Sequence, residues 1–331
     1  MAKRAVIIGG VCVLAVGLAA TVVCLALNDA PTFPKGYSVG IWDWTAPDHE
    51  TRAQQEANAS ALQREGVTDV YIDISSYNDH DEIADPAARE QQRAAFINAL
   101  RDEVILLHSH GIRAGALAGN AHWANSDYWY VPLKLMDFVA SYNKGASTDE
   151  QLTGIQFDIE FYSAPEFQDN PTQSVADYKN VVEQLCDKYR TLFSGAGAPG
   201  FGFVIPSWFD GSNTAIPKTP KPLAFWLADE LHTLPQSMIA VMAYRMQPDG
   251  VDGTEAKMRP ILSYVQQSDP SVHVLIGQET TDVRPAKITF YGHSMADMKQ
   301  AAVRLQTTFG GNRSFTGFMV NDETGFLRLK D

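Results

Sequence analysis

One short stretch of the chain places two carboxylic acids at the end of a strand-like pattern. Between Leu152 and Tyr162, apolar residues alternate with polar or small ones, and the polar series ends at Asp158 and Glu160. Such alternation is typical of a β-strand with two different faces. In an α/β protein both faces are covered, so two carboxylates in one inward row are costly unless the environment separates their pKa values. Asp158 and Glu160 are therefore a candidate acid–base pair.

Other polar side chains with chemical potential follow apolar runs elsewhere in the sequence. By the same alternation, these side chains are expected to point inward or to lie at a strand end: Asp73, Tyr244, Arg245, Glu279 and Asn321. If the runs are parallel strands, their carboxyl ends meet at one edge, and these groups converge with Asp158 and Glu160 on one pocket.

The elements that must position these residues are strands alternating with helices. Helical patterns end at glycines such as Gly66 and Gly111, each followed within a few residues by an apolar run. The expected strands cover residues 37–42, 69–74, 112–117, 154–160, 202–205, 238–244, 272–277 and 316–321. Eight strands in about 300 residues favour a single (β/α)8 TIM barrel over a doubly wound sheet, with residues 31–331 as one domain.

Five of the six tryptophans fall at or after these strand ends: Trp42, Trp44, Trp123, Trp129 and Trp208. Flat aromatic faces stack well on the apolar faces of sugar rings, so we expect Trp42, Trp123 and Trp208 to contact a carbohydrate. Asp73, Arg245 and Asn321 complete the expected substrate-binding set.

The first residues of the chain form a different kind of segment. Residues 5–27 carry no charge and follow Lys3 and Arg4, and the run is long enough to span a bilayer. We expect residues 1–30 to be a membrane anchor, with the following domain outside the cytoplasm, or else a cleaved signal segment.

Composition excludes several classes of partner. The formal charge is −13 and the pI is near 5.0, which argues against nucleic acid or an anionic membrane surface as a partner. No zinc-ligand spacing or phosphate-binding loop survives inspection, so neither a metal nor a cofactor is expected. We expect a monomer.

The stretch from Thr153 to Glu160 resembles the fourth-strand signature of family 18 glycoside hydrolases, the chitinases and chitinase-like proteins, which reads D-G-x-D-x-D-x-E. The residues Val241 to Tyr244 resemble the M-x-Y motif of their sixth strand. The resemblance implies that Glu160 is the general acid, Asp158 its electrostatic partner, and Tyr244 a hydroxyl group that steadies the intermediate. It also implies a TIM barrel that acts on glycosidic bonds.

The sequence also departs from that family pattern. Thr153 and Gln156 stand where the motif has its first two aspartates, Arg245 replaces the aspartate usual after the tyrosine, and the eighth strand lacks the family's pocket-floor tryptophan. These departures weigh against an N-acetylated substrate, because the family mechanism uses the acetamido group as nucleophile. They leave two functions open: an extracytoplasmic glycosidase, or a carbohydrate-binding barrel without catalysis.

Glu279 offers a second mechanism. Many retaining glycosidase barrels carry an acid/base glutamate after the fourth strand and a nucleophilic glutamate after the seventh, and Glu160 and Glu279 occupy those places. A separation of roughly 5 Å between the two carboxyl groups leads to retention, and about 6.5 to 9.5 Å leads to inversion. The alternative for Glu279 is a structural ion pair, with Arg245 as one partner.

Overall fold

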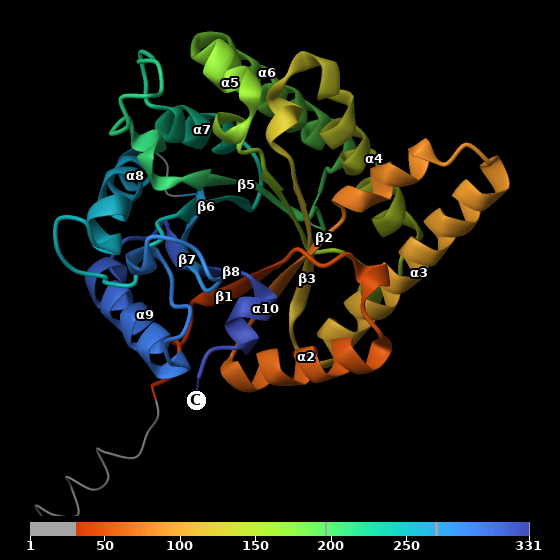
Figure 1. The fold of residues 1–331 in the computed structure, drawn as a ribbon, viewed down its shortest axis with the longest axis horizontal. Coiled ribbons are helices and arrows are strands. Elements are labelled where there is room, and N and C mark those ends of the chain that lie inside the picture. Colours follow the sequence, from red (N-terminus) through yellow and green to blue (C-terminus); the bar gives the residue numbers. More distant parts are fainter. Residues whose placement is uncertain (1–30, 196, 269–270, 331) are drawn as a thin grey trace, which may run out of the picture. The chain divides into compact units, whose positions relative to one another are not determined.

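Eight parallel strands close into a barrel in the computed structural model, which describes residues 31–195, 197–268 and 271–330 (Figure 1). The strands are β1 (Ser38–Asp43), β2 (Asp69–Asp73), β3 (Arg113–Gly119), β4 (Gly154–Asp158), β5 (Gly200–Pro206), β6 (Ser237–Met242), β7 (His273–Glu279) and β8 (Phe315–Asn321). Each pairs with its neighbour in sequence, and β8 pairs with β1. The predicted TIM barrel is confirmed.

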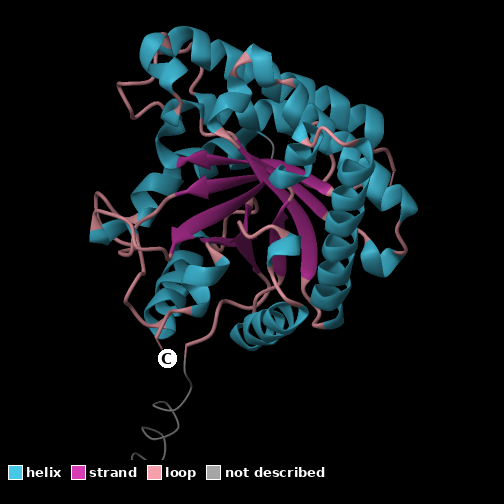
Figure 2. Ribbon diagram, turned by 45° about the vertical axis from the view of Figure 1, so that its right-hand side comes forward, coloured by secondary structure: helices cyan, strands magenta, loops and turns pink. Residues whose placement is uncertain are grey.

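Helices surround the barrel on its outside (Figure 2). They are α2 (Arg52–Glu65), α3 (Pro86–Ser109), α4 (Tyr130–Gly145), α5 (Pro165–Asp169), α6 (Pro171–Leu192), α7 (Leu223–Leu231), α8 (Thr254–Ser268), α9 (Met295–Phe309) and α10 (Glu323–Leu327). Gly66 ends α2 in the left-handed region at φ 86°, as its position in the sequence predicts. The main apolar core lies between these helices and the outward faces of the strands.

Inside the barrel, large side chains lie next to glycines. Trp42, Tyr71 and Met319 belong to a separate buried cluster inside the barrel. A side chain at Gly115 would lie 2.6 Å from the Tyr71 ring, so that glycine makes room for the tyrosine. The inward-facing glycines therefore set which large residues fill each layer.

Two strands end earlier than the sequence pattern predicts. Strand β4 stops at Asp158 and β6 stops at Met242, each two residues before the polar residue of interest. In both, the chain folds back in a tight turn: Phe161 N–H donates to Ile159 O (2.9 Å), and Ala243 N–H donates to Val241 O (2.7 Å). Glu160 and Tyr244 therefore lie just beyond the sheet, at the carboxyl ends of their strands.

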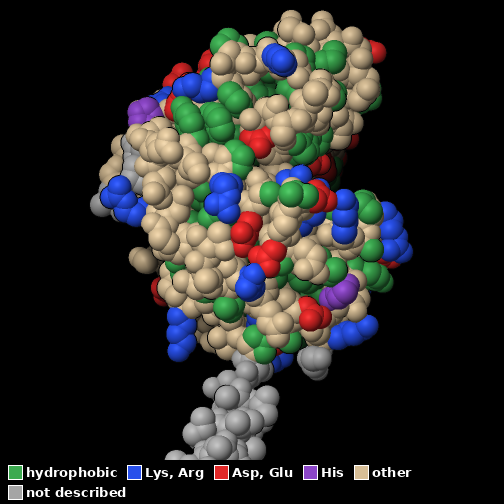
Figure 3. Space-filling model, turned by 90° about the vertical axis from the view of Figure 1, so that its left-hand side faces the viewer, with side chains coloured by type: hydrophobic (Ala, Val, Ile, Leu, Met, Phe, Trp, Pro, Cys, Tyr) green, Lys and Arg blue, Asp and Glu red, His purple; other side chains and the backbone are tan. Residues whose placement is uncertain are grey.

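The expected membrane anchor lies outside the described residues. Within the described part of the chain, no helix has the length and apolar character needed to cross a bilayer. On the face drawn in Figure 3, Lys and Arg are interspersed with Asp and Glu, and no basic patch extends across it.

Candidate functional site

The carboxyl ends of the strands bring the predicted site residues to one end of the barrel, which we call the barrel mouth. The ladder pairs Gly119 with Asp158 and pairs Asn321 with both Glu279 and Trp42. Asp73 ends β2 on the same inward series as Tyr71. The convergence of these strand-end residues matches the sequence expectation.

Asp158 is placed where a negative charge is unfavourable. Its Oδ1 is shielded from solvent and has no hydrogen-bond partner among the described residues. Burial, with the nearby Glu160 as the second cause, raises the pKa of Asp158 well above its ordinary value. Asp158 therefore holds its proton more tightly than an exposed aspartic acid does.

Glu160 is oriented by a tyrosine that the sequence reading did not single out. The Tyr162 hydroxyl donates a hydrogen bond to Glu160 Oε1. Burial and the adjacent Glu160 carboxylate raise the pKa of Tyr162, so this donor stays protonated. The Tyr162 ring packs edge-on against Trp208, with 4.6 Å between ring centroids. Tyr162 lies two residues after Glu160, and this short spacing is the feature of the sequence that could have indicated a contact between them.

Tyr244 follows β6 and lies close enough to Glu279, Asp158 and Glu160 to feel their charges. Its ring packs against the cluster inside the barrel. Burial is the main reason that the pKa of Tyr244 is raised well above its ordinary value, with Glu279 and Asp158 as the next causes. The hydroxyl therefore stays protonated at neutral pH, and the role that the family 18 resemblance implies for Tyr244 stays a prediction.

Glu279 and Arg245 do not form the ion pair that was the alternative to a nucleophilic Glu279. The Arg245 guanidinium donates to Asp252 Oδ1 (2.8 Å) and to the Tyr244 carbonyl oxygen (2.7 Å). Asp252 also binds Lys287, so Arg245 belongs to a surface ion-pair group. Glu279 forms no ion pair in the described part of the chain and is instead held by neutral donors.

Only some of the tryptophans that were expected to contact a carbohydrate are accessible to a ligand. Trp42 is 1% exposed and donates from Nε1 to Gln156 Oε1 (2.7 Å) inside the barrel. Trp123 is 5% exposed and packs in the outer core. Neither indole face is open to a ligand, in contrast to the expected stacking. Trp208 and Trp44 are partly exposed, and Trp44 follows directly after the last residue of β1, Asp43.

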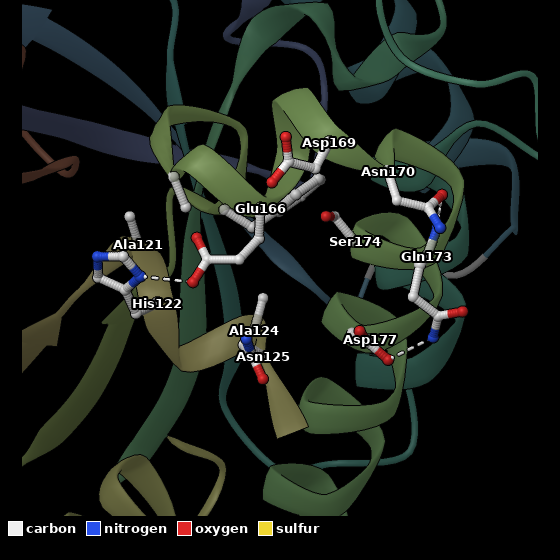
Figure 4. Close-up of a pocket in the computed structure, with 12 residues that line it drawn as sticks. Ala121, His122, Ala124, Asn125, Glu166, Asp169, Asn170, Gln173, Ser174 and Asp177 are labelled. Carbon is white, nitrogen blue, oxygen red and sulfur yellow. Dashed lines mark hydrogen bonds and ion pairs between the residues drawn. The ribbon is translucent and has the colours of Figure 1, made fainter. Parts of the chain in front are cut away.

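Two cavities of the described chain contain neither carboxyl group of the acid pair. A pocket of about 250 Å³ lies beside α6, where His122 Nδ1 and Glu166 Oε1 are 3.0 Å apart (Figure 4). A second cavity of about 440 Å³ is lined by Asp69 and Arg113 at the amino-terminal end of the strands. Neither is lined by Asp158 or Glu160. The amino-terminal end, where the second cavity lies, serves stability in a TIM barrel. We therefore place the candidate active site at the barrel mouth.

No side-chain cluster in the described part of the chain has the composition of a metal site. The described site consists of carboxyl, amide, phenol and indole groups, whose chemistry is proton transfer and hydrogen bonding to polar ligands.

Comparison with family models and with curated proteins gave no match. Among solved structures, the chain is similar to the exo-β-1,4-mannosidase Op5Man5 from Opitutaceae bacterium strain TAV5, with a TM-score of 0.53 and 12% identity over 89% of this chain. The match covers 54% of the mannosidase, so this chain spans about half its length. A structure described as a glycoside hydrolase has a TM-score of 0.51 and 10% identity, covering 92% of this chain and 67% of the other.

A family 18 chitinase from Cycas revoluta in complex with allosamidin gives a TM-score of 0.49 and 10% identity, covering 88% of this chain and 96% of the chitinase. At 10% to 12% identity, the mannosidase and the structure described as a glycoside hydrolase show a shared barrel fold and nothing further. The family 18 assignment remains a proposal.

Proposed function

We propose that this chain is a glycoside hydrolase that uses Glu160 as its general acid. The observation that carries the proposal is the arrangement of Asp158, Glu160 and Tyr162 at the barrel mouth, where one carboxyl group is buried beside another whose Oε1 is fixed by a phenol. Two carboxyl groups in different environments are the usual equipment for glycosidic bond cleavage.

The proposed reaction begins with proton transfer from Glu160 to the glycosidic oxygen. The C–O bond breaks with its electron pair on the leaving oxygen, and positive charge develops at the anomeric carbon. Water or a neighbouring substrate group then attacks that carbon, and Glu160 takes a proton back. Asp158 and the hydroxyl of Tyr244 stabilise the developing charges from within the pocket.

The test is turnover on a panel of β-1,4-linked gluco-, manno- and N-acetylgluco-oligosaccharides, followed by mass spectrometry across pH 4 to 9. Cleavage products that depend on Glu160 support the proposal. Binding of at least one oligosaccharide, with cleavage of none of them, supports the second candidate, a carbohydrate-binding barrel without catalysis. That candidate is favoured by Gln156, whose side chain is committed to Trp42 and to Met238 Sδ (3.2 Å) instead of serving as a motif carboxylate.

Replacing Asp158 with asparagine is expected to lower turnover by at least about tenfold, or 1.4 kcal/mol in the barrier. Asparagine keeps the shape but removes one of two titrating carboxyl groups. The pH–rate profile should also change, because burial and the nearby Glu160 raise the pKa of Asp158 and the asparagine has no such proton to lose. An unchanged rate with an unchanged profile would make Asp158 a structural residue.

The location of the protein remains a proposal that rests on residues 5–27. If this segment is an uncleaved anchor, the full chain should fractionate with membranes, resist carbonate extraction and retain its amino terminus. Terminal sequencing that finds a mature start between Asn28 and Pro34 would favour secretion instead.

A further inference from the structure

A chain of side-chain hydrogen bonds crosses from β7 over β8 to the residue after β1. Asn321 donates from Nδ2 to Glu279 Oε2 (2.8 Å) and accepts at Oδ1 from Trp44 Nε1 (3.0 Å). We call this the Glu279–Asn321–Trp44 relay. A carboxylate only accepts and an indole N–H only donates, so the amide of Asn321 can satisfy both neighbours in one orientation alone.

Glu279 is buried and accepts four hydrogen bonds from the protein, three of them at one oxygen. Its Oε1 accepts from the backbone N–H of Thr280 (2.8 Å), the backbone N–H of Thr281 (2.7 Å) and the Thr281 hydroxyl (2.8 Å). Its Oε2 accepts from Asn321, and the residue is 4% exposed. A nucleophilic carboxylate needs a free oxygen facing the substrate. Glu279 is instead held as a fixed acceptor.

The indole of Trp44 reaches across the barrel mouth. Its Nε1 lies at Asn321 on β8, while its Cη2 lies 3.0 Å from where a Cβ of Gly119 on β3 would be. The same Cβ position is 3.1 Å from Asp158 Cβ, so the far edge of the ring lies beside the acid pair. Trp44 packs on the interior cluster with Tyr244 and is partly exposed. The absence of a side chain at Gly119 makes this placement possible.

We propose that Trp44 is the platform on which a sugar ring lies in the pocket, and that Glu279 is a positioning residue that fixes Trp44 through Asn321. The proposal rests on the proposed function for its ligand, a pyranose presenting an apolar face to the indole. The hydrogen bond to Nε1 sets the rotation of the ring, and Glu279 sets the direction of the amide that makes this bond. Trp44 is the residue that directly follows β1.

An exchange of the two relay groups tests the positioning role. In E279Q, the new amide must turn its NH₂ toward the NH₂ of Asn321, and a flip of Asn321 would then face the indole N–H with a donor. In N321D, two carboxylates face each other. In the double variant E279Q/N321D, the new glutamine donates to the new aspartate, which accepts from Trp44 Nε1, so the relay is complete again.

We expect each single variant to lower kcat/KM on the cleaved oligosaccharide by about tenfold or more, the effect of one strong hydrogen bond. The double variant should recover to within about threefold of the wild type, because one tenfold step of about 1.4 kcal/mol is regained. Trp226→Phe, on α7 away from the mouth, serves as the matched control. Recovery without a carboxyl group at position 279 is incompatible with a nucleophilic Glu279.

The indole N–H resonance of Trp44 gives a readout that does not require turnover. Assigned by loss in Trp44→Phe, it should shift in both single variants and return in the double variant, and it should shift when mannopentaose or chitopentaose is added to the wild type. If the resonance follows the relay but no sugar perturbs it and no substrate is cleaved, the relay stands as a fold element and the proposed function fails.

Two outcomes overturn the positioning role. One is a double variant that folds like the wild type but is no better than the singles in activity or resonance. The other is activity of Glu279→Gly that returns with azide and yields a glycosyl azide, because a small anion then replaces a missing nucleophile.

Discussion

Replacement of Glu160 by glutamine is expected to lower turnover by about 10² to 10⁴-fold, the usual contribution of a general acid. Glutamine keeps the shape and can still accept the hydrogen bond from the Tyr162 hydroxyl. It cannot give a proton to the glycosidic oxygen. Binding of the oligosaccharide, measured by calorimetry, should therefore change little while the rate falls.

The matched control is Glu166→Gln. Glu166 lies six residues further along the chain on α5 and pairs with His122 in the pocket beside α6, outside the barrel mouth. This variant loses the same charge and should keep wild-type turnover. If Glu160→Gln retains more than a tenth of wild-type activity, Glu160 is not the general acid.

The order of the strands and the location of the site follow from local sequence patterns. Apolar runs of period two, glycine caps and strand-end polar residues depend on neighbours in sequence, and they correctly predicted the barrel and the convergence of Asp158, Glu279 and Asn321. The strand limits were less predictable. Trp42 and Trp44 share one face, and only the true strand end decides which of them emerges at the mouth.

The ion-pair and hydrogen-bond partners of individual side chains were the hardest feature to predict from the sequence. Arg245 could have paired with Glu279 or with Asp252, and the choice depends on loop geometry that no local pattern encodes. The donors to Glu279 belong to Thr280, Thr281 and Asn321. Thr280 and Thr281 follow Glu279 directly in the sequence. Their role depends on how the chain turns after β7.

A cluster of carboxyl groups that no sequence pattern groups together lies beside the barrel, and we call it the acidic cluster. It consists of Asp43, Glu50, Glu103 and Glu323. Its hydrogen-bond partners are amides: Asn58 donates to Glu323 Oε2 (2.9 Å) and Gln55 donates to Glu103 Oε2 (3.3 Å). In the described part of the chain, none of the four forms an ion pair with Lys, Arg or His.

Burial, reinforced by the mutual repulsion of these groups, keeps protons on the acidic cluster. Burial raises the pKa of Asp43 to about 7, and Glu50 adds to the effect. Burial raises the pKa of Glu323 to about 9, with Asp43 as the next cause. The pKa of Glu103 is raised well above its ordinary value mainly by burial. Each of these acids binds its proton more tightly in the folded chain than in the unfolded one.

The folded protein is therefore expected to lose stability as pH rises from 5 to 9. A raised folded-state pKa gives a contribution that is fully present below the unfolded pKa, near 4, and is lost as pH passes through the folded pKa, near 7 for Asp43 and near 9 for Glu323. Ionising Asp43 costs about 4 kcal/mol in total at 1.36 kcal/mol per pKa unit, of which about 3 kcal/mol is lost above pH 5. Urea unfolding at pH 5, 7 and 9 measures this loss.

Neutral replacements identify the source of the effect. Glu103→Gln and Glu323→Gln should each flatten the decline in unfolding free energy between pH 5 and 9, because fewer buried acids must ionise and those that remain repel one another less. Glu166→Gln removes a partly exposed acid outside the cluster and should leave the slope unchanged. Asp252 and Glu150 do not interfere, since hydrogen bonds hold the pKa of each below its ordinary value and both are ionised throughout this range. An unfolding free energy that is constant or increases from pH 5 to 9 would show that the acidic cluster is already ionised in the folded protein.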